Sequence, residues 1–183
     1  MQPFPCLNRI IVEGPSKRGD SITLKLTIDE AYKQYADRVF AAAFNVCQNK
    51  EDADDVVQDT FIKYHSFKKE FTDEEHIKAW LLRVAINRAK DIRASFWKKN
   101  KVTWEEYMAD LSFTEPEDVH IFEAVMKLPK KYRIVIHLYY FEEYSIAEIA
   151  NILHSSTGTV KSQLSRGRSY LKQMLKEEWD YDE

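Results

Sequence analysis

A group of short polar and basic side chains recurs at helical spacing near the end of the chain. Its members are Thr157, Thr159, Lys161, Ser162, Ser165, Arg166 and Arg168. Hydroxyl groups mixed with cations can bond to base edges and phosphates when a helix enters the major groove of DNA. The solvated face of an ordinary helix has a similar composition, so the elements around this face must decide between the two interpretations.

Those elements are two short helices joined by a tight turn. Ser145 and Glu148 have the spacing of a capping box at the start of the first helix, and Ser156 can cap the second. Small Ala150 before the turn and apolar Val160 after it allow the helices to approach closely. This pattern predicts a helix-turn-helix, and its coincidence with the polar, basic face favours DNA binding.

A second group of polar side chains is acidic. Asp54, Asp55, Gln58 and Asp59 fall on the outward side of a helix expected to begin near residue 51. Acids in a first helical turn are stabilised by the helix dipole. That explanation suits Asp52 but not Asp59, so a surface for a basic partner competes with it.

A third group lies on a helix expected over residues 76–97. Its outward side carries Arg83, Asn87, Lys90 and Arg93, and Lys98 and Lys99 follow. Asparagine within a helix costs propensity, so an exposed Asn87 favours a functional role.

The 183 residues include only four glycines and five prolines, which favours an all-α chain. The net charge of −3 conceals two basic blocks, at residues 83–101 and 127–176, with acidic stretches between and after them. We expect two small helical domains joined by a flexible linker, and the second domain is the helix-turn-helix domain. The two basic blocks predict two nucleic-acid contacts, and the acidic stretches predict a surface for a basic partner.

Other chemistry lacks support in the sequence. Cys6 and Cys47 suit neither a disulfide framework nor a zinc site, and the five histidines lack metal-ligand spacing. No phosphate-binding loop or nucleophile motif occurs, so we expect no metal, no cofactor, no small-molecule substrate and no enzymatic activity. No apolar stretch is long enough to span a membrane, and the expected location is cytoplasmic.

Five motifs in order resemble the extracytoplasmic-function group of bacterial RNA polymerase sigma factors. They are Tyr35-x-x-Arg38-Val39-Phe40, residues 52–61 (DADDVVQDTF), residues 79–93 (AWLLRVAINRAKDIR), residues 128–133 (LPKKYR) and residues 148–162 (EIANILHSSTGTVKS). The resemblance implies a subunit that binds core RNA polymerase, recognises promoter DNA and helps to melt it. It further implies contacts with the clamp and flap regions of the polymerase, and regulation by an anti-sigma factor.

The resemblance assigns roles to all three groups of residues. Asp54, Asp55, Gln58 and Asp59 match the helix that docks on the polymerase clamp. The matches to the minus-ten element, which include the loop that holds a flipped base, are Phe71, Arg83, Asn87, Lys90, Arg93, Lys98 and Lys99. Lys161, Ser162, Ser165 and Arg166 match readers of the minus-thirty-five element, with Thr157, Thr159 and Arg168 positioning the DNA backbone.

The implied organisation is an N-terminal extension of unknown role (residues 1–26), a sigma region two domain (27–97), a linker (98–118), a sigma region four domain (119–176) and an acidic tail (177–183). His154 replaces the usual glycine of the turn, and Gln163 replaces a common basic residue. The alternative is a stand-alone dimeric helix-turn-helix regulator, which leaves the acidic helix and the first basic stripe without a role. A helical scaffold that only sequesters partner proteins is a third alternative.

Overall fold

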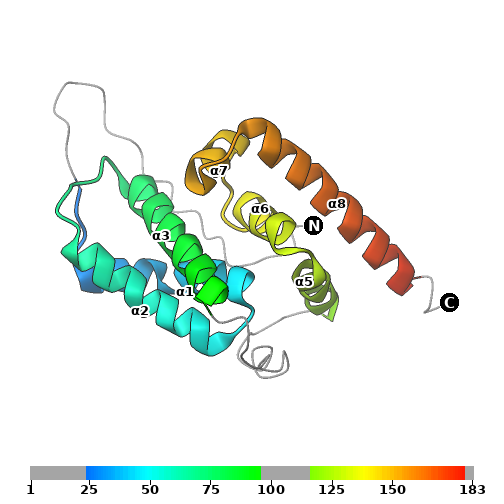
Figure 1. The fold of residues 1–183 in the computed structure, drawn as a ribbon, viewed down its shortest axis with the longest axis horizontal. Coiled ribbons are helices and arrows are strands. Elements are labelled where there is room, and N and C mark those ends of the chain that lie inside the picture. The colour runs from blue at the N-terminus through cyan, green and yellow to red at the C-terminus, as the bar shows by residue number, and fades with distance from the viewer. Residues whose placement is uncertain (1–23, 96–115, 180–183) are drawn as a thin grey trace.

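The computed structural model describes residues 24–95 and 116–179, and seven helices make up this part of the chain (Figure 1). They are α1 (Ile28–Cys47), α2 (Lys50–Ser66), α3 (Glu74–Ser95), α5 (Pro116–Lys127), α6 (Lys130–Tyr140), α7 (Ile146–Leu153) and α8 (Thr157–Trp179). The only β interaction in the described residues is one antiparallel bridge between Leu24 and Phe71. The prediction of an all-α chain is confirmed, while most of the predicted linker lies outside the described residues.

Local capping explains where the first helices begin and end. Thr27 and Glu30 form a capping box at the start of α1, and Gln48 ends that helix in the left-handed region at φ 52°. The side chain of Asn49 then accepts the Asp52 N–H at 2.8 Å to start α2. α3 begins two residues earlier than predicted, because Asp73 accepts the backbone N–H of His76 at 2.7 Å.

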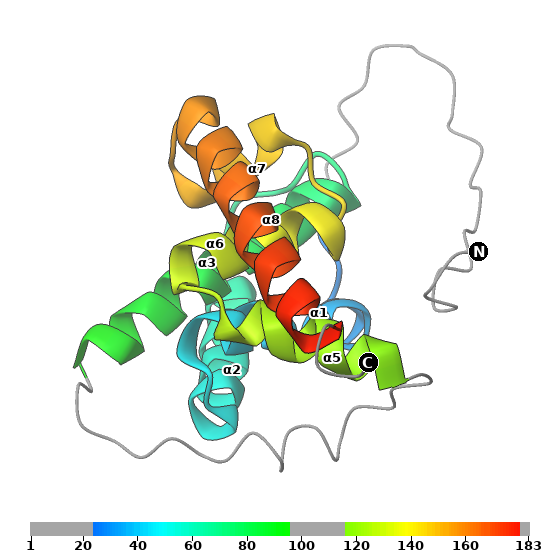
Figure 2. The same ribbon diagram turned by 90° about the vertical axis from the view of Figure 1, so that its right-hand side faces the viewer.

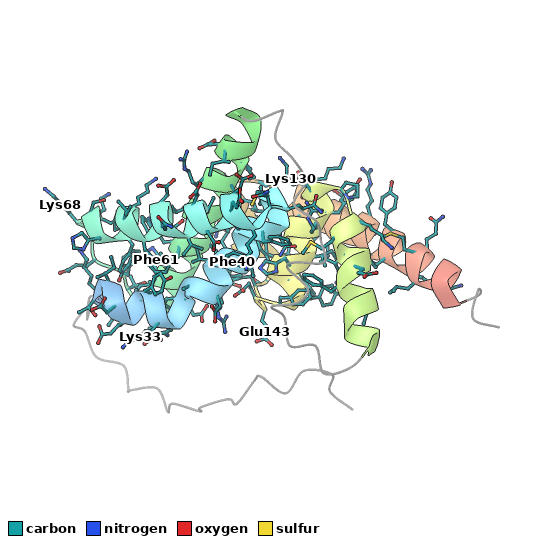
Figure 3. The ribbon with its side chains drawn as sticks, turned by 90° about the horizontal axis from the view of Figure 1, so that it is seen from below. Lys33, Phe40, Phe61, Lys68, Lys130 and Glu143 are labelled. Atoms are coloured by element: carbon teal, nitrogen blue, oxygen red, sulfur yellow. The ribbon has the colours of Figure 1, made fainter. Side chains whose placement is uncertain are left out.

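α1, α2 and α3 pack against one another as an N-terminal unit (Figure 1). Its core includes fully buried Val39, Val56 and Leu81. Seen from below, Phe61 lies between α1 and α2, whereas Lys68 projects outward beyond the end of α2 (Figure 3). The buried sides of all three helices meet in the middle of this unit, which leaves the outward side of α2 to solvent.

α5 to α8 form a C-terminal unit, in which the long helix α8 packs against α5, α6 and α7 (Figure 2). Val160 and Leu164 are the buried residues on the first turns of α8. Gly167 allows the closest approach, because a Cβ added there would lie 3.1 Å from Cγ1 of Ile136. The helix-turn-helix is therefore supported from behind by α6.

The two units also pack against each other. α6 lies against α1, and α7 lies against α3 (Figure 1). One continuous cluster of buried apolar residues runs through both units. Neither the composition nor the spacing of motifs predicted this arrangement.

Candidate nucleic-acid and polymerase interfaces

The start of α7 is fixed by the capping box that the sequence predicted. The Glu148 carboxylate accepts the Ser145 N–H at 2.8 Å, and the Ser145 hydroxyl accepts the Glu148 N–H at 3.3 Å. Hydrogen bonds from the Ser145 side chain and backbone lower the pKa of Glu148. Glu148 therefore remains ionised at the positive end of α7, where the helix dipole favours a negative charge.

The turn between α7 and α8 uses a residue with unusual backbone geometry. His154 adopts the left-handed conformation at φ 49°, and its N–H bonds to the last carbonyls of α7. The next residue, Ser155, donates its N–H to the Ala150 carbonyl at 2.9 Å. Ser156 then accepts the Thr159 N–H at 3.0 Å, which caps α8 as predicted. The turn is thus closed at both sides, although histidine stands in the position that glycine would occupy with least strain.

The structure brings all the residues predicted to contact the minus-thirty-five element onto the exposed side of α8. Thr157, Thr159, Lys161, Ser162, Ser165, Arg166 and Arg168 are all exposed. The Ser162 hydroxyl donates to the Thr159 carbonyl at 2.9 Å. The Arg168 guanidinium lies over the rings of Tyr139 and Tyr140, 5.2 and 5.5 Å from their centroids. Arg168 is therefore held by α6, while the first turns of α8 present their polar groups outward.

The acidic face of α2 is also exposed. Asp54, Asp55 and Gln58 point to solvent, but Asp59 forms an ion pair with Arg88 of α3, at 2.6 Å between Nε and Oδ2. One turn further along, Ile62 leaves 66% of its surface exposed, the largest fraction among the exposed large hydrophobic residues. Ile62 was not among the residues predicted from the sequence, although an isoleucine on the polar side of an amphipathic helix is a signal of a protein-binding face.

Apart from Phe71, the residues predicted to contact the minus-ten element divide into three groups. Asn87 is exposed on α3, as the sequence predicted. Arg83 and Lys90 face the C-terminal unit: Arg83 donates to the Asn151 carbonyl of α7 at 3.0 Å, and burial together with nearby Lys130 lowers the pKa of Lys90. Arg93 lies on the last turn of α3, and Lys98 and Lys99 lie outside the described residues.

Phe71 differs from the other members of that set because its side chain is buried, with 1% of its surface exposed. Its ring packs among those of Tyr64, Phe67 and Trp80, with centroid distances of 5.3 to 5.9 Å. In this arrangement Phe71 supports the α2–α3 loop from within and does not present a stacking surface to DNA.

An ion pair between a half-exposed arginine and a buried carboxylate joins the two units. Arg38 of α1 lies 3.0 Å from the carboxylate of Glu142, whose side chain is only 4% exposed. The imidazole Nε2 of His137 lies 3.8 Å from the other oxygen of that carboxylate. Burial raises the pKa of Glu142 against the opposing effect of Arg38, and burial lowers the pKa of His137 to about 4. His137 is therefore neutral near pH 7, and Arg38 is the cation in contact with Glu142.

Arg133 provides a second polar link between the units. Its guanidinium is buried and donates to the carbonyls of Asn45, Met126 and Leu128 at 2.6, 2.7 and 3.0 Å. Asn45 belongs to α1, whereas Met126 lies in the last turn of α5 and Leu128 directly follows that helix. The Gln48 amide also donates to Met126, at 2.9 Å. These bonds tie the end of α1 to the α5–α6 corner.

Other kinds of site are not found in the described residues. No cluster of three or more His, Cys, Asp or Glu side chains there could hold a metal ion. None of the helices in residues 24–95 and 116–179 combines the length and apolar character needed to cross a membrane.

Comparison with protein families matches the two units to two parts of one family. The model for sigma-70 region 2 matches residues 31–101, and the model for sigma-70, region 4 matches residues 120–171. The chain is 29% identical over 178 residues to the ECF RNA polymerase sigma factor SigW of Bacillus subtilis, covering 88% of this chain and 93% of SigW. It is 31% identical over 142 residues to the RNA polymerase sigma factor SigV of the same organism, covering 76% of this chain and 85% of SigV.

Two solved structures share the fold. The sigma factor RpoE, in complex with the anti-sigma factor NepR from Bartonella quintana, has a TM-score of 0.59 and 23% identity, covering 81% of this chain and 96% of that one. CnrH, in complex with the cytosolic domain of CnrY, has a TM-score of 0.60 and 23% identity, covering 81% and 87% of the two chains.

Proposed function

The chain belongs to the extracytoplasmic-function group of RNA polymerase sigma factors, and we propose that its two helical units divide the promoter between them. As a sigma factor it binds core RNA polymerase, recognises promoter DNA and helps to start transcription. The observation that carries this conclusion is the ordered match of sigma regions two and four, one on each unit. Its role is one of binding, and we assign it no chemical step.

In the proposed division, α8 reads the minus-thirty-five element in the major groove. The exposed side chains of Lys161, Ser162, Ser165 and Arg166 supply donors and acceptors for base edges, which lie within reach of the first turns of a docked helix. Thr157 and Thr159 lie at the helix start, where backbone N–H groups and short hydroxyls suit a phosphate.

The N-terminal unit would hold the melted minus-ten element. Unstacking a base costs a few kcal/mol, so a site on the protein that captures the unstacked base helps to open the duplex. The exposed tip of the α2–α3 loop, at residues 68–70, and exposed Asn87 of α3 are the proposed site. Lys90 and Arg83 would grip phosphates once they are released from the C-terminal unit.

The outward side of α2 is the proposed docking surface for the polymerase clamp. Asp54, Asp55 and Gln58 supply charge and hydrogen-bond acceptors for a basic partner, and exposed Ile62 adds an apolar contact beside them. An Asp55→Lys variant should lose affinity for core polymerase, whereas Asp37→Lys, the same charge reversal at an exposed position of α1, should change it little. Equal losses in both variants would reject this surface.

We further propose that an anti-sigma factor regulates this protein, and that it acts in the cytoplasm, where core polymerase and promoters are found. Both structural neighbours are complexes with a second protein, one of them named as an anti-sigma factor. The stand-alone dimeric regulator is the weaker alternative, because the similarity to SigW extends over both units rather than over the helix-turn-helix alone.

Run-off transcription with core polymerase tests the proposal, using promoter fragments from the same genome. We expect transcripts that depend on this protein and that fall at least tenfold in the Lys161→Ala/Arg166→Ala variant, since a good base contact contributes about 1–3 kcal/mol. Lys176→Ala is the control, because Lys176 is exposed on α8 but lies outside the predicted surface. Tight binding to duplex operators without polymerase, and no dependent transcript, would favour the dimeric regulator.

A further inference from the structure

The segment just before α1 crosses the loop between α2 and α3. Leu24 and Phe71 form an antiparallel bridge, in which each backbone N–H donates to the other residue's carbonyl, at 2.7 and 3.1 Å. Lys25 Nζ donates to the Phe67 carbonyl at 2.7 Å, and the Tyr64 hydroxyl donates to the Leu26 carbonyl at 2.9 Å. Residues 24–27 are referred to below as the strap.

The alternating pattern of the sequence explains why the strap lies flat on the loop. Leu24 and Leu26 are partly buried and pack on the core, whereas Lys25 and Thr27 are exposed. Thr27 also starts α1 through its capping box with Glu30. The strap is therefore anchored at its end by a helix and along its length by apolar contacts.

The loop depends on the strap for its backbone hydrogen bonds. The N–H and the carbonyl of Phe71 both bond to Leu24, and the Phe67 carbonyl bonds to Lys25. Backbone groups near a protein core need partners, because an unsatisfied group costs free energy. The strap thus fixes both ends of a short tip, residues 68–70, which is exposed and projects away from the molecule at Lys68 (Figure 3).

We propose that the strap is a positioning element for the minus-ten strand, holding the tip of the α2–α3 loop in the conformation that receives an unstacked base. This inference rests on the proposed function, which assigns base capture to that loop. A tip fixed at both ends binds with a smaller loss of conformational entropy than a mobile one. The strap contributes to recognition without contacting DNA itself.

The strap makes two side-chain bonds that can be removed with little change in shape. Lys25→Ala removes the donor to Phe67, and Tyr64→Phe removes the hydroxyl but keeps the buried ring. Leu24→Pro is an independent variant, because proline has no N–H to donate to Phe71. Lys33→Ala is the control, since it removes an exposed lysine from α1 that lies outside the strap, and Lys25→Arg is the conservative variant expected to restore binding.

The test uses holoenzyme assembled with each variant, together with a promoter fragment that run-off transcription has identified as dependent on this protein. Binding is measured to the single nontemplate strand of the minus-ten region and, separately, to the duplex of the minus-thirty-five region. We expect the Lys25→Ala/Tyr64→Phe variant to bind the single strand roughly three- to tenfold more weakly, from the loss of two hydrogen bonds. Binding to the duplex and to core polymerase should stay within about twofold of the wild type, and Leu24→Pro should behave in the same way.

Unchanged single-strand binding in both variants would overturn the positioning role. So would an equal loss of affinity for the strand, the duplex and core polymerase, because that result indicates a general loss of structure. If wild-type holoenzyme itself does not retain the single strand, then the assignment of base capture to this unit fails instead, and the two failures are thereby distinguished.

Discussion

Replacing Arg38 by alanine should open the contact between the two units. Arg38 lies 3.0 Å from the carboxylate of Glu142, whose side chain is only 4% exposed. Removing Arg38 takes away the ion-pair partner of the buried carboxylate and leaves Lys78 of α3 to stabilise its charge, and the loss of one partner costs more than the pair itself contributes. The variant can avoid this cost by separating the units, which returns Glu142 to water.

The free energy by which Arg38→Ala destabilises the packed arrangement has a lower and an upper limit. Arg38 is 44% exposed, so solvent screens the pair, and about 1 kcal/mol is the least we expect. The upper limit is set by protonation, since a carboxyl group with a usual pKa of 4.5 can be neutralised at pH 7 for about 3.4 kcal/mol, at about 1.4 kcal/mol per pH unit. A cost of about 1–3.4 kcal/mol corresponds to roughly a 5- to 300-fold shift of the equilibrium toward separated units.

Energy transfer between two dyes measures that shift. Cysteines introduced at exposed Lys33 and Lys172 carry the dyes, with Cys6 replaced by serine and buried Cys47 by alanine. Transfer efficiency should fall in Arg38→Ala, while circular dichroism keeps its helical signal. Unchanged transfer efficiency would refute the idea that this pair holds the units together.

The pH dependence of the same variant supplies a second test. Burial raises the pKa of Glu142, so its contribution favours the packed arrangement at low pH and is lost as the pH rises through that pKa. Without Arg38 the pKa of Glu142 rises further, and separation should increase as the pH is raised above the usual carboxyl value of 4.5.

His137 affects the packing of the two units with the opposite pH dependence. Burial lowers its pKa to about 4, so the neutral imidazole favours the packed arrangement near pH 7, and this contribution is lost as the pH falls below the usual value of 6.5. The Arg38→Ala/Glu142→Gln variant keeps His137 but removes the carboxylate. The difference between the single and the double variant therefore isolates Glu142. We expect the double variant to regain most of the transfer efficiency, and a double variant that stays separated would contradict the role of a stranded carboxylate.

Three further predictions concern the helix-turn-helix and are measured by thermal or denaturant unfolding. His154→Gly should stabilise the protein by up to about 1 kcal/mol, because it relieves the left-handed strain at φ 49°, and a loss of stability would contradict that strain. Gly167→Ala should destabilise it by up to about 2 kcal/mol, because the added Cβ would lie 3.1 Å from Cγ1 of Ile136 and this crowding outweighs the gain of about 0.5–1 kcal/mol from alanine in a helix; an unchanged or raised midpoint would show that the Ile136 side chain moves away freely. Ser156→Ala should cost about 1 kcal/mol through loss of the α8 cap, and Ser156→Asn, which can still cap, should restore stability.

The helices were predictable because their signals are local. Helical periodicity placed α1 to within a residue at each end, and the spacing of Ser145 and Glu148 predicted the capping box that starts α7. The same periodicity showed which face of α8 is exposed, since Val160 and Leu164 define the buried side. The left-handed His154 was also predictable, because a residue must take that conformation where the turn normally has glycine.

The contact between the units was not predictable, because no local pattern encodes it. Glu142 stands beside exposed Glu143, and only tertiary packing makes one of them buried. Arg133 belongs to a recognisable motif, but its bond to Asn45 joins residues 88 positions apart. Phe71 illustrates the same limit, since an aromatic residue in a polar loop suggests stacking on a base, whereas its ring completes an aromatic cluster beneath the loop.

The packed arrangement has a consequence for promoter binding that follows from distance alone. The minus-ten and minus-thirty-five elements lie about 25 base pairs apart, or roughly 85 Å at 3.4 Å per base pair. Arg83, predicted to contact the first element, donates a hydrogen bond to the helix-turn-helix predicted to read the second, and 23-residue α8 is only about 35 Å long. On the proposed assignment of the two elements, the packed units cannot reach both at once, and we predict that they separate on the promoter. The polar contacts that would have to break are Arg38 with Glu142, Arg133 with Asn45, and Gln48 with Met126, and the buried apolar cluster that runs through both units would part with them. Water can replace the polar partners but not the apolar contacts, so polymerase binding to the two units has to supply the free energy of exposing that apolar surface.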